Sequence, residues 1–241
     1  MSYKNILKGF ILFVLFSGCT AQQIQQAKKT LEDALGEETV SSAEVANGLK
    51  EALIQGTQKG TDMVSQLNGY YKNPQIKIPF PPDAQKVADK LRTIGMGDQV
   101  DEFIQTLNRG AEQAAKEATP IFINVIKAMT IADAWGILKG DQTAATDYLK
   151  TNSYIDLEKA FLPKIKAALD QTKATKYYSD LVTAYNKIPL VEKVNPELDQ
   201  YATQKAIDGL FVMIAKEEQN IRANPLARTS DLLKKVFSQQ D

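Results

Sequence analysis

The stretch VDEFIQTLNRGAEQAAKEA, residues 100–118, carries the pattern that decides the fold. Its apolar residues recur every three or four positions, which is the spacing of one face of an α-helix. Thr119-Pro120 follows, and proline predicts a break because it cannot continue a helix without losing a hydrogen bond. The residues on the apolar face are Val100, Phe103, Ile104, Leu107, Ala111, Ala114 and Ala118.

The same spacing recurs along most of the chain. It predicts helices from Ser42 to the Asn68-Gly69 turn, and over 83–94, 98–118, 121–129, 131–138, 178–185, 197–222 and 230–237. Another helix is expected to begin after the Lys139-Gly140-Asp141 stop. Capping-box patterns predict two helix starts, at Thr130 with Asp133 and at Ser153 with Asp156. We therefore predict an all-α fold, a single multi-helix bundle domain over residues 41–238.

One segment interrupts the helical pattern. NPQIKIPFPPD, residues 73–83, contains four prolines and cannot be a helix. Ile76, Ile78 and Phe80 alternate with other residues, which indicates an extended segment and leaves room for one short β-strand pair near residues 74–80. The helix expected next, over 83–94, should turn inward Val87, Leu91 and Ile94.

The N-terminus has the pattern of a secretion signal. Lys4 and Lys8 precede the apolar run FILFVLF, residues 10–16. This run is far shorter than the roughly 20 residues that a membrane-spanning helix needs. It ends in Ser17-Gly18-Cys19, and small residues directly before a cysteine resemble the lipobox of bacterial lipoproteins. The resemblance implies that residues 1–18 are removed and that Cys19 receives the lipid.

Two details qualify this interpretation. Phe16 stands where the lipobox usually has leucine, and the alternative is a plain signal peptide with a chance cysteine. Thr20, in place of the aspartate that retains lipoproteins at the inner membrane, implies an outer-membrane location facing the periplasm. Residues 19–40 are then a tether, able to form a surface helix because Ile24, Ala27, Leu31 and Ala34 share one face.

Composition excludes several classes of function. The chain has no histidine, and Cys19 is its single cysteine. The common zinc sites, Ser-His-Asp triads and Cys-His pairs are therefore excluded, and we expect no catalytic residue of these kinds, no metal site and no cofactor. The 29 basic and 29 acidic residues balance, which argues against nucleic acid as a partner.

Several polar residues fall on or beside the apolar faces of the predicted helices. Glu218 lies on the inner face of the helix over 197–222, with Arg222 one turn on in the favourable i,i+4 order. These residues predict either a polar pocket for an anionic or polar ligand or a buried ion-pair network that fixes helix register, and we favour the second. The candidates are Asn108, Arg109, Glu112, Asp208, Glu218, Arg222 and Arg228.

Several longer stretches together resemble one family. They include NPQIKIPFP (73–81), LNRGAEQA (107–114), AATDYLK (144–150) and KAIDGLFVMIAKEEQNIRANPLARTSDLLKKVF (205–237). In this combination they resemble the bacterial family known as domain of unknown function 4197, over about residues 41–237. The resemblance implies a helical protein that is commonly a lipoprotein. That family has no established activity, so it implies no catalytic residue.

Two functions from different classes follow from these observations. The first is a membrane-anchored, non-catalytic binding or scaffolding module whose partner is an envelope protein or a lipid-like or anionic ligand. The alternative is a carboxylate-dependent hydrolase acting on a cell-envelope polymer, which needs two acidic groups about 5–9.5 Å apart in a cleft. Its candidate residues are Glu112, Glu217 and Glu218.

Overall fold

The computed structural model describes residues 41–171, 174–187, 189–190, 192–195, 197–228 and 230–237. Cys19, the predicted signal and the predicted tether lie outside these residues. Within them there are helices and no strand, so the all-α prediction is confirmed and a strand pair near 74–80 is not found. The helices are α2 (Ser42–Ser65), α3 (Gln85–Thr93), α4 (Gly97–Ala115), α5 (Ala118–Ala128), α6 (Ile131–Lys139), α7 (Ala144–Gln171), α8 (Ala174–Tyr185), α9 (Leu198–Ala223) and α10 (Asp231–Phe237), with 3₁₀ turns at Pro82–Ala84 and Pro225–Ala227.

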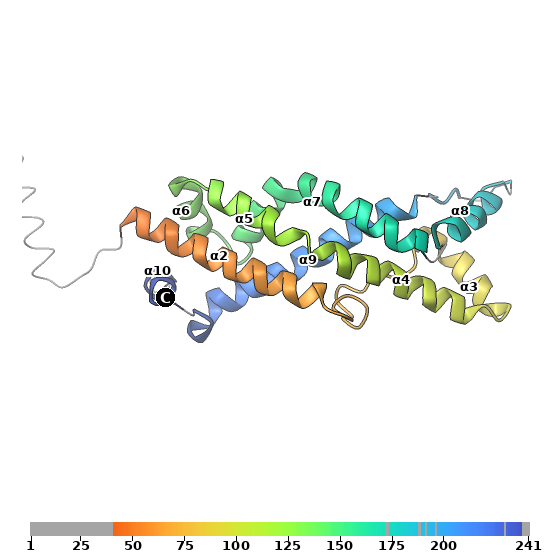
Figure 1. The fold of residues 1–241 in the computed structure, drawn as a ribbon, viewed down its shortest axis with the longest axis horizontal. Coiled ribbons are helices and arrows are strands. Elements are labelled where there is room, and N and C mark those ends of the chain that lie inside the picture. The colour runs from red at the N-terminus through yellow and green to blue at the C-terminus, as the bar shows by residue number, and fades with distance from the viewer. Residues whose placement is uncertain are drawn as a thin grey trace, which may run out of the picture. The chain divides into compact units, whose positions relative to one another are not determined.

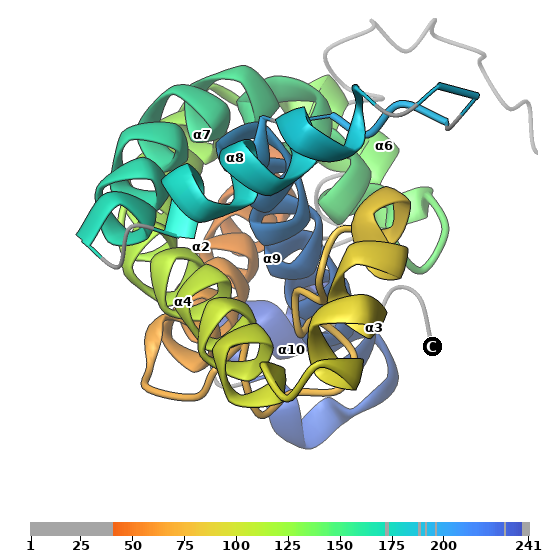
Figure 2. The same cartoon turned by 90° about the vertical axis from the view of Figure 1, so that its right-hand side faces the viewer.

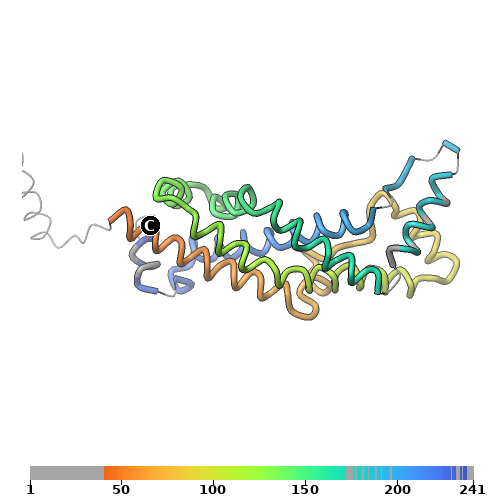
Figure 3. Tube along the Cα trace, turned by 45° about the horizontal axis from the view of Figure 1, so that its top comes forward, coloured from red at the N-terminus to blue at the C-terminus, as the bar shows by residue number. Residues whose placement is uncertain are grey.

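Four long helices, α2, α4, α7 and α9, make the body of the domain (Figure 1). The end-on view places α9 among the others, and it packs on α2, α4, α7 and α8 (Figure 2). Figure 3 shows that α10 and the first turn of α2 lie at one end of the domain, while α3 and α8 lie at the other. The central position of α9 explains why apolar residues occur on more than one of its faces, including Leu210, Phe211 and Ile214, all of them buried.

Glycines let the long helices approach one another. A Cβ at Gly60 of α2 would lie 3.3 Å from the Ile214 side chain of α9, and one at Gly56 would lie 3.5 Å from Ile221. Because Gly56 faces the later residue of α9 and Gly60 the earlier one, the two helices run antiparallel. Gly110 does the same for α4 against α7, where a Cβ would lie 3.3 Å from Ala168.

The extended segment predicted over residues 73–83 is part of the core. Ile76, Ile78 and Phe80 are buried, while Lys77 and Pro79 between them are exposed, so the predicted alternation is confirmed. Its burial has the two-residue period of a strand, but residues 74–76 form a turn in which the N–H groups of Ile76 and Lys77 donate to the Asn73 carbonyl oxygen, so the extended conformation predicted there is wrong. At the end of the segment, the Phe80 ring packs on the rings of Phe103 and Tyr178.

Three further local predictions are wrong for physical reasons. The break predicted at Thr119-Pro120 comes earlier, because α4 ends at Ala115 and α5 begins at Ala118; Pro120 lies in the first turn of α5, where no intrahelical N–H bond is needed. Ser153 does not begin a helix: it lies inside the continuous α7, and its hydroxyl donates to the carbonyl oxygen of Leu149 one turn earlier at 2.6 Å. Serine can satisfy itself in this way inside a helix as well as at its start. Ile94 does not turn inward but is 59% exposed, because α3 ends at Thr93 and Ala88 is its buried residue. Thr130, in contrast, does form the predicted capping box with Asp133.

Candidate functional site

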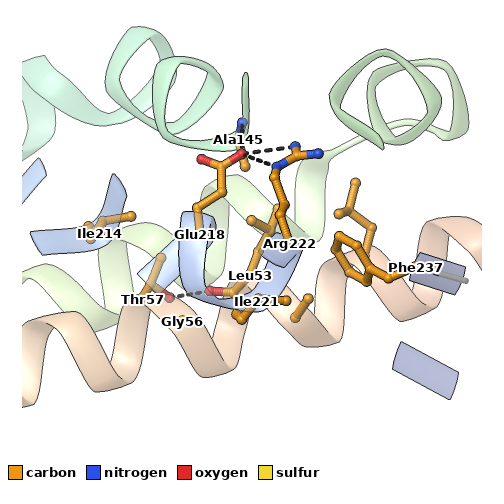
Figure 4. Close-up of a pocket in the computed structure, with 11 residues that line it drawn as sticks. Leu53, Gly56, Thr57, Ala145, Ile214, Glu218, Ile221, Arg222 and Phe237 are labelled. Carbon is orange, nitrogen blue, oxygen red and sulfur yellow. Dashed lines mark hydrogen bonds and ion pairs between the residues drawn. The ribbon is translucent and has the colours of Figure 1, made fainter. Parts of the chain in front are cut away.

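Glu218 is a charged group in the interior, and both of its carboxylate oxygens have hydrogen-bond partners. Its carboxylate accepts hydrogen bonds from the backbone N–H of Ala145 at 2.9 Å and of Thr146 at 2.8 Å, and from the Thr146 hydroxyl at 2.8 Å. Both residues belong to the first turn of α7, whose N–H groups have no partner inside the helix. Glu218 of α9 therefore caps the start of α7, where the helix dipole favours a negative charge (Figure 4).

Arg222 completes the arrangement one turn further along α9. Its Nε and Nη2 donate to Glu218 Oε1 at 3.0 and 2.9 Å, and both side chains are 6% exposed. The guanidinium also donates to the carbonyl oxygens of Ile137 at 2.9 Å and Leu138 at 3.4 Å, near the end of α6. The pair thus places its anion at a helix start and its cation at a helix end, and it ties α6, α7 and α9 together.

A second polar group holds the connection between α2 and α3. Glu112 of α4 accepts from the backbone N–H groups of Tyr70 and Tyr71, each at 3.2 Å, and from Arg109 Nη1 at 2.6 Å. Arg109 Nη2 donates to the side-chain oxygen of Asn68 at 2.9 Å. Asn68 has a φ of +73°, a conformation that asparagine tolerates better than most residues. The carboxylate and guanidinium thereby fix the turn after α2.

Next to this group, the Asn108 side chain makes the backbone hydrogen bonds to Ile78 that a neighbouring strand would make in a sheet. Its side-chain oxygen accepts from the N–H of Ile78 at 2.8 Å, and its nitrogen donates to the carbonyl oxygen of Ile78 at 2.8 Å and of Ile104 at 2.7 Å. One amide side chain satisfies both backbone groups of a buried residue, which otherwise would cost about 1–3 kcal/mol each.

The remaining two candidates lie elsewhere. Arg228 is buried, donates to the carbonyl oxygens of Ile221 and Arg222 at the end of α9, and lies over the ring of Phe237. Asp208 is on the surface, 3.4 Å from Lys150 Nζ. The seven residues are therefore divided among several places, and of them only Glu218 and Arg222 border the cavity drawn in Figure 4.

That cavity is too small to hold a ligand. Its volume is about 20 Å³, enough for roughly one water molecule. A larger hollow of about 370 Å³ lies on the surface between α2, the last turns of α9 and the Pro225–Ala227 turn. This volume falls within the range of small-ligand sites. We call it the α2/α9 groove, and its lining residues are Gln55, Gly56, Lys59, Glu217, Asn220, Ile221, Asn224, Leu226 and Ala227.

The chemistry of the α2/α9 groove is mixed. Lys59 Nζ pairs with Glu217 Oε2 at 2.6 Å, which joins the two walls. Asn220, Asn224 and Gln55 contribute amides, and Leu226 projects from the rim at 92% exposed. Of the lining residues, Glu217 alone was a candidate from the sequence. The available signal was the spacing of Glu217, Asn220 and Asn224, which repeats every three or four residues and so places three polar residues along one face of α9.

Metal chemistry finds no support in the described part of the chain. No group of three or more acidic or cysteine side chains gathers there in a way that could hold an ion. Among the buried charged side chains there, Glu112, Glu218, Arg222 and Arg228 serve helix ends and a turn.

Comparison with known families supports the resemblance found in the sequence. Residues 39–238 match the family described as "Protein of unknown function (DUF4197)". The chain belongs to this family. The match spans all the described helices, so the helical bundle, the Glu218–Arg222 pair and the α2/α9 groove all lie within the DUF4197 region. No curated protein and no solved structure matches the chain.

Proposed function

We propose that this DUF4197 protein is a lipoprotein anchored through Cys19 to the outer membrane, facing the periplasm, and that its domain is a non-catalytic binding module. The observation that carries the proposal is the contrast between the two kinds of polar residue. Glu112, Glu218 and Arg222 are buried and serve helix ends and a turn, whereas the Lys59–Glu217 pair, Asn220 and Asn224 line a surface hollow of about 370 Å³ and can be reached by a partner.

The same geometry weighs against the hydrolase alternative. Glycosidic and related hydrolysis needs two carboxyl groups that face each other across a substrate. Glu112 is bound to the turn after α2, and Glu218 to the start of α7. Glu217, although adjacent to Glu218 in sequence, turns toward Lys59 in the groove. Each candidate carboxylate therefore has its own partners and its own location.

The lining of the α2/α9 groove fits a protein segment better than a lipid. An amide side chain carries both a donor and an acceptor, as a peptide group does, so Asn220 matches an extended backbone. Asn224, whose Oδ1 accepts from the Leu226 N–H at 3.0 Å, adds its amide nitrogen. Leu226 at the rim offers an apolar contact for a side chain of the partner. A lipid chain would need a large apolar cavity, and the cavity beside Glu218 holds about one water molecule. The proposed partner is thus an envelope protein.

Site-specific photo-crosslinking in the native cell tests the groove. A crosslinking amino acid replacing Leu226 should give a discrete adduct with one envelope protein, and Asn220→Lys in the same chain should abolish it. The matched control places the same amino acid at Ile155, which is 66% exposed on α7. The same adduct from Ile155, or an adduct that persists with Asn220→Lys, would exclude the groove as the binding face.

Metabolic labelling tests the anchor separately. Radiolabelled palmitate should enter the wild-type chain and not a Cys19→Ser variant, which should also leave the membrane fraction. Label in both chains would place the lipid elsewhere, and label in neither would favour the plain signal peptide.

A further inference from the structure

Helix α6 has an outer face with fewer charges than a surface helix usually carries. Its sequence is IADAWGILK, residues 131–139. The inner face, with Ala134, Ile137 and Leu138, is buried against the bundle. A helix with one face in water normally concentrates its polar residues on that face. Here the outer positions are mostly apolar or small, so the helix has two apolar sides and only one of them is covered.

Three residues at intervals of four run along this outer face. Ile131 is 50% exposed, Trp135 is partly exposed, and the Lys139 ammonium lies 5.0 Å from the centre of the Trp135 indole. The exposed positions between them, Ala132 and Gly136, are small. We call this stripe of Ile131, Trp135 and Lys139 the α6 face.

The one acidic residue of α6 is engaged at the start of the helix. Asp133 accepts from the backbone N–H of Thr130 at 2.9 Å and from its hydroxyl at 2.7 Å. The last turn of the preceding helix adds a second exposed cation, Lys127. An apolar residue, a tryptophan and lysines at the edge are the chemistry of a membrane interface, where indole rings lie at headgroup level and lysines reach the phosphates.

The composition of the α5–α6 corner points the same way. Among the described helices, no single one is long and apolar enough to cross a membrane. The helices α5 and α6 reach that length and apolar character only together, and they are bent by 107° at their junction. Phe122 and Ile126 hold α5 inside the bundle. The geometry therefore favours a corner that lies on a lipid surface over one that spans it.

The position of this corner in the domain matches the proposed anchor. Figures 1 and 3 place α6 at the end of the domain where α2 begins, at Ser42. Lys50 of α2 donates to the carbonyl oxygen of Lys127, which binds the corner to the first half of α2. Residues 20–40 between Cys19 and the domain reach at most about 70 Å when fully extended, so with Cys19 lipidated the start of α2 stays within that distance of the bilayer.

From these observations we propose that the α6 face rests on the surface of the membrane that holds the lipid anchor. The inference rests on the proposed lipidation of Cys19, which limits the distance between domain and bilayer. Ile131 and Trp135 enter the headgroup region, and Lys139 and Lys127 contact lipid phosphates. The contact fixes one orientation of the domain and leaves its other surfaces open to the periplasm.

Trp135 is the only tryptophan of the chain, which makes it a direct reporter. The full mature lipoprotein is reconstituted in vesicles of phosphatidylethanolamine and phosphatidylglycerol, with and without a lipid carrying a nitroxide near the headgroup. Because interfacial residues lie about 5–10 Å into the headgroup boundary, the nitroxide should lower Trp135 emission about twofold. Ile131→Ser with Lys139→Ala should remove most of this quenching. Ile155→Ser, the control on α7, should retain it.

The outcomes separate this inference from the proposed function. Vesicles that float with the protein while Trp135 stays unquenched by the nitroxide would overturn the α6 contact and leave the anchor intact. Protein that fails to float would overturn the anchor and this inference together. A discrete protein adduct from a photo-crosslinking amino acid at Ile131 in native cells, together with unquenched Trp135 in pure lipid vesicles, would assign the α6 face to a protein partner and overturn the lipid contact.

Discussion

At the scale of single residues, a buried charge is stable in this protein because it forms hydrogen bonds with the unpaired backbone groups at helix ends. Glu218 and Arg222 satisfy each other and also unpaired backbone groups of α7 and α6. Transfer of either charge alone into the interior would cost several kcal/mol. The pairing itself was predictable from the i,i+4 spacing in the sequence. The backbone partners were not, because a helix start in another part of the chain leaves no mark on the sequence around Glu218.

Glu218→Gln tests this role of the buried pair. The change leaves Arg222 as an unpaired buried cation and weakens the cap of α7, so the free energy of unfolding should fall by about 3–5 kcal/mol. Urea denaturation followed by circular dichroism measures it. The control Asp208→Asn breaks an ion pair to Lys150 on the surface and should cost less than about 1 kcal/mol. Equal losses in the two variants would contradict the difference in burial.

Two glycines inside helices should respond to alanine with opposite signs. A Cβ at Gly209 of α9 would lie 2.8 Å from Cε1 of Tyr70, whose ring is buried and whose hydroxyl donates to the carbonyl oxygen of Ala206. Gly209→Ala should therefore destabilise the protein by about 1–3 kcal/mol. A Cβ at Gly136 of α6 meets open space, so Gly136→Ala should stabilise it by about 0.5–1 kcal/mol. Thermal unfolding of both variants gives the two signs directly.

At the scale of elements, the segment over residues 74–80 shows what sequence patterns can and cannot settle. Its alternating burial was predictable because the two-residue period and the prolines both exclude a helix. Its pairing was not, because an extended segment can be completed by a strand or by side chains. Asn108 of α4 supplies that completion from a helix. The serine at 153 failed as a helix start for a similar reason, since its hydroxyl has two alternative uses.

Asn108→Ala should release this segment locally. Both backbone groups of Ile78 lose their partner in a buried place, so the free energy of unfolding should fall by about 2–4 kcal/mol. Hydrogen exchange should speed up in peptides covering residues 74–80 before α2 is affected. Asn152→Ala removes an exposed bond to the carbonyl oxygen of Tyr148 and should change stability by about 0.5 kcal/mol or less. Unchanged exchange over 74–80 would show that packing alone holds the segment.

At the scale of the whole molecule, the all-α class and most helices could be predicted because their apolar period is long and regular. The arrangement of the helices could not, since it depends on which faces meet. Gly56 and Gly60 of α2, for example, fit the residues of α9 and give no sign of that partner in their own sequence. The α2/α9 groove is a product of this arrangement. Its walls come from residues more than 150 positions apart, such as Lys59 and Glu217.

The packing of the molecule also determines how it responds to alkaline pH. Burial, with Glu112 nearby, raises the pKa of Tyr70, and burial with Asp83 nearby raises the pKa of Tyr178. Burial with Asp83 nearby also raises the pKa of Tyr201 to about 12. A tyrosine whose pKa is higher in the folded state than in the unfolded chain, where it titrates near 10, stabilises the folded state. This stabilisation is complete below about pH 10. This contribution is lost as pH rises through the folded pKa.

The free energy of unfolding should therefore fall as pH rises above about 10. Each such tyrosine adds a slope of about 1.4 kcal/mol per pH unit. Tyr70→Phe should lower stability at neutral pH, because the bond to the Ala206 carbonyl oxygen is lost, and should make the alkaline slope less steep by about that amount. Urea denaturation at several pH values between 8 and about 11 measures both effects. A variant with the wild-type slope would mean that Tyr70 ionises in the folded protein as readily as in the unfolded chain, which its complete burial beneath α9 argues against.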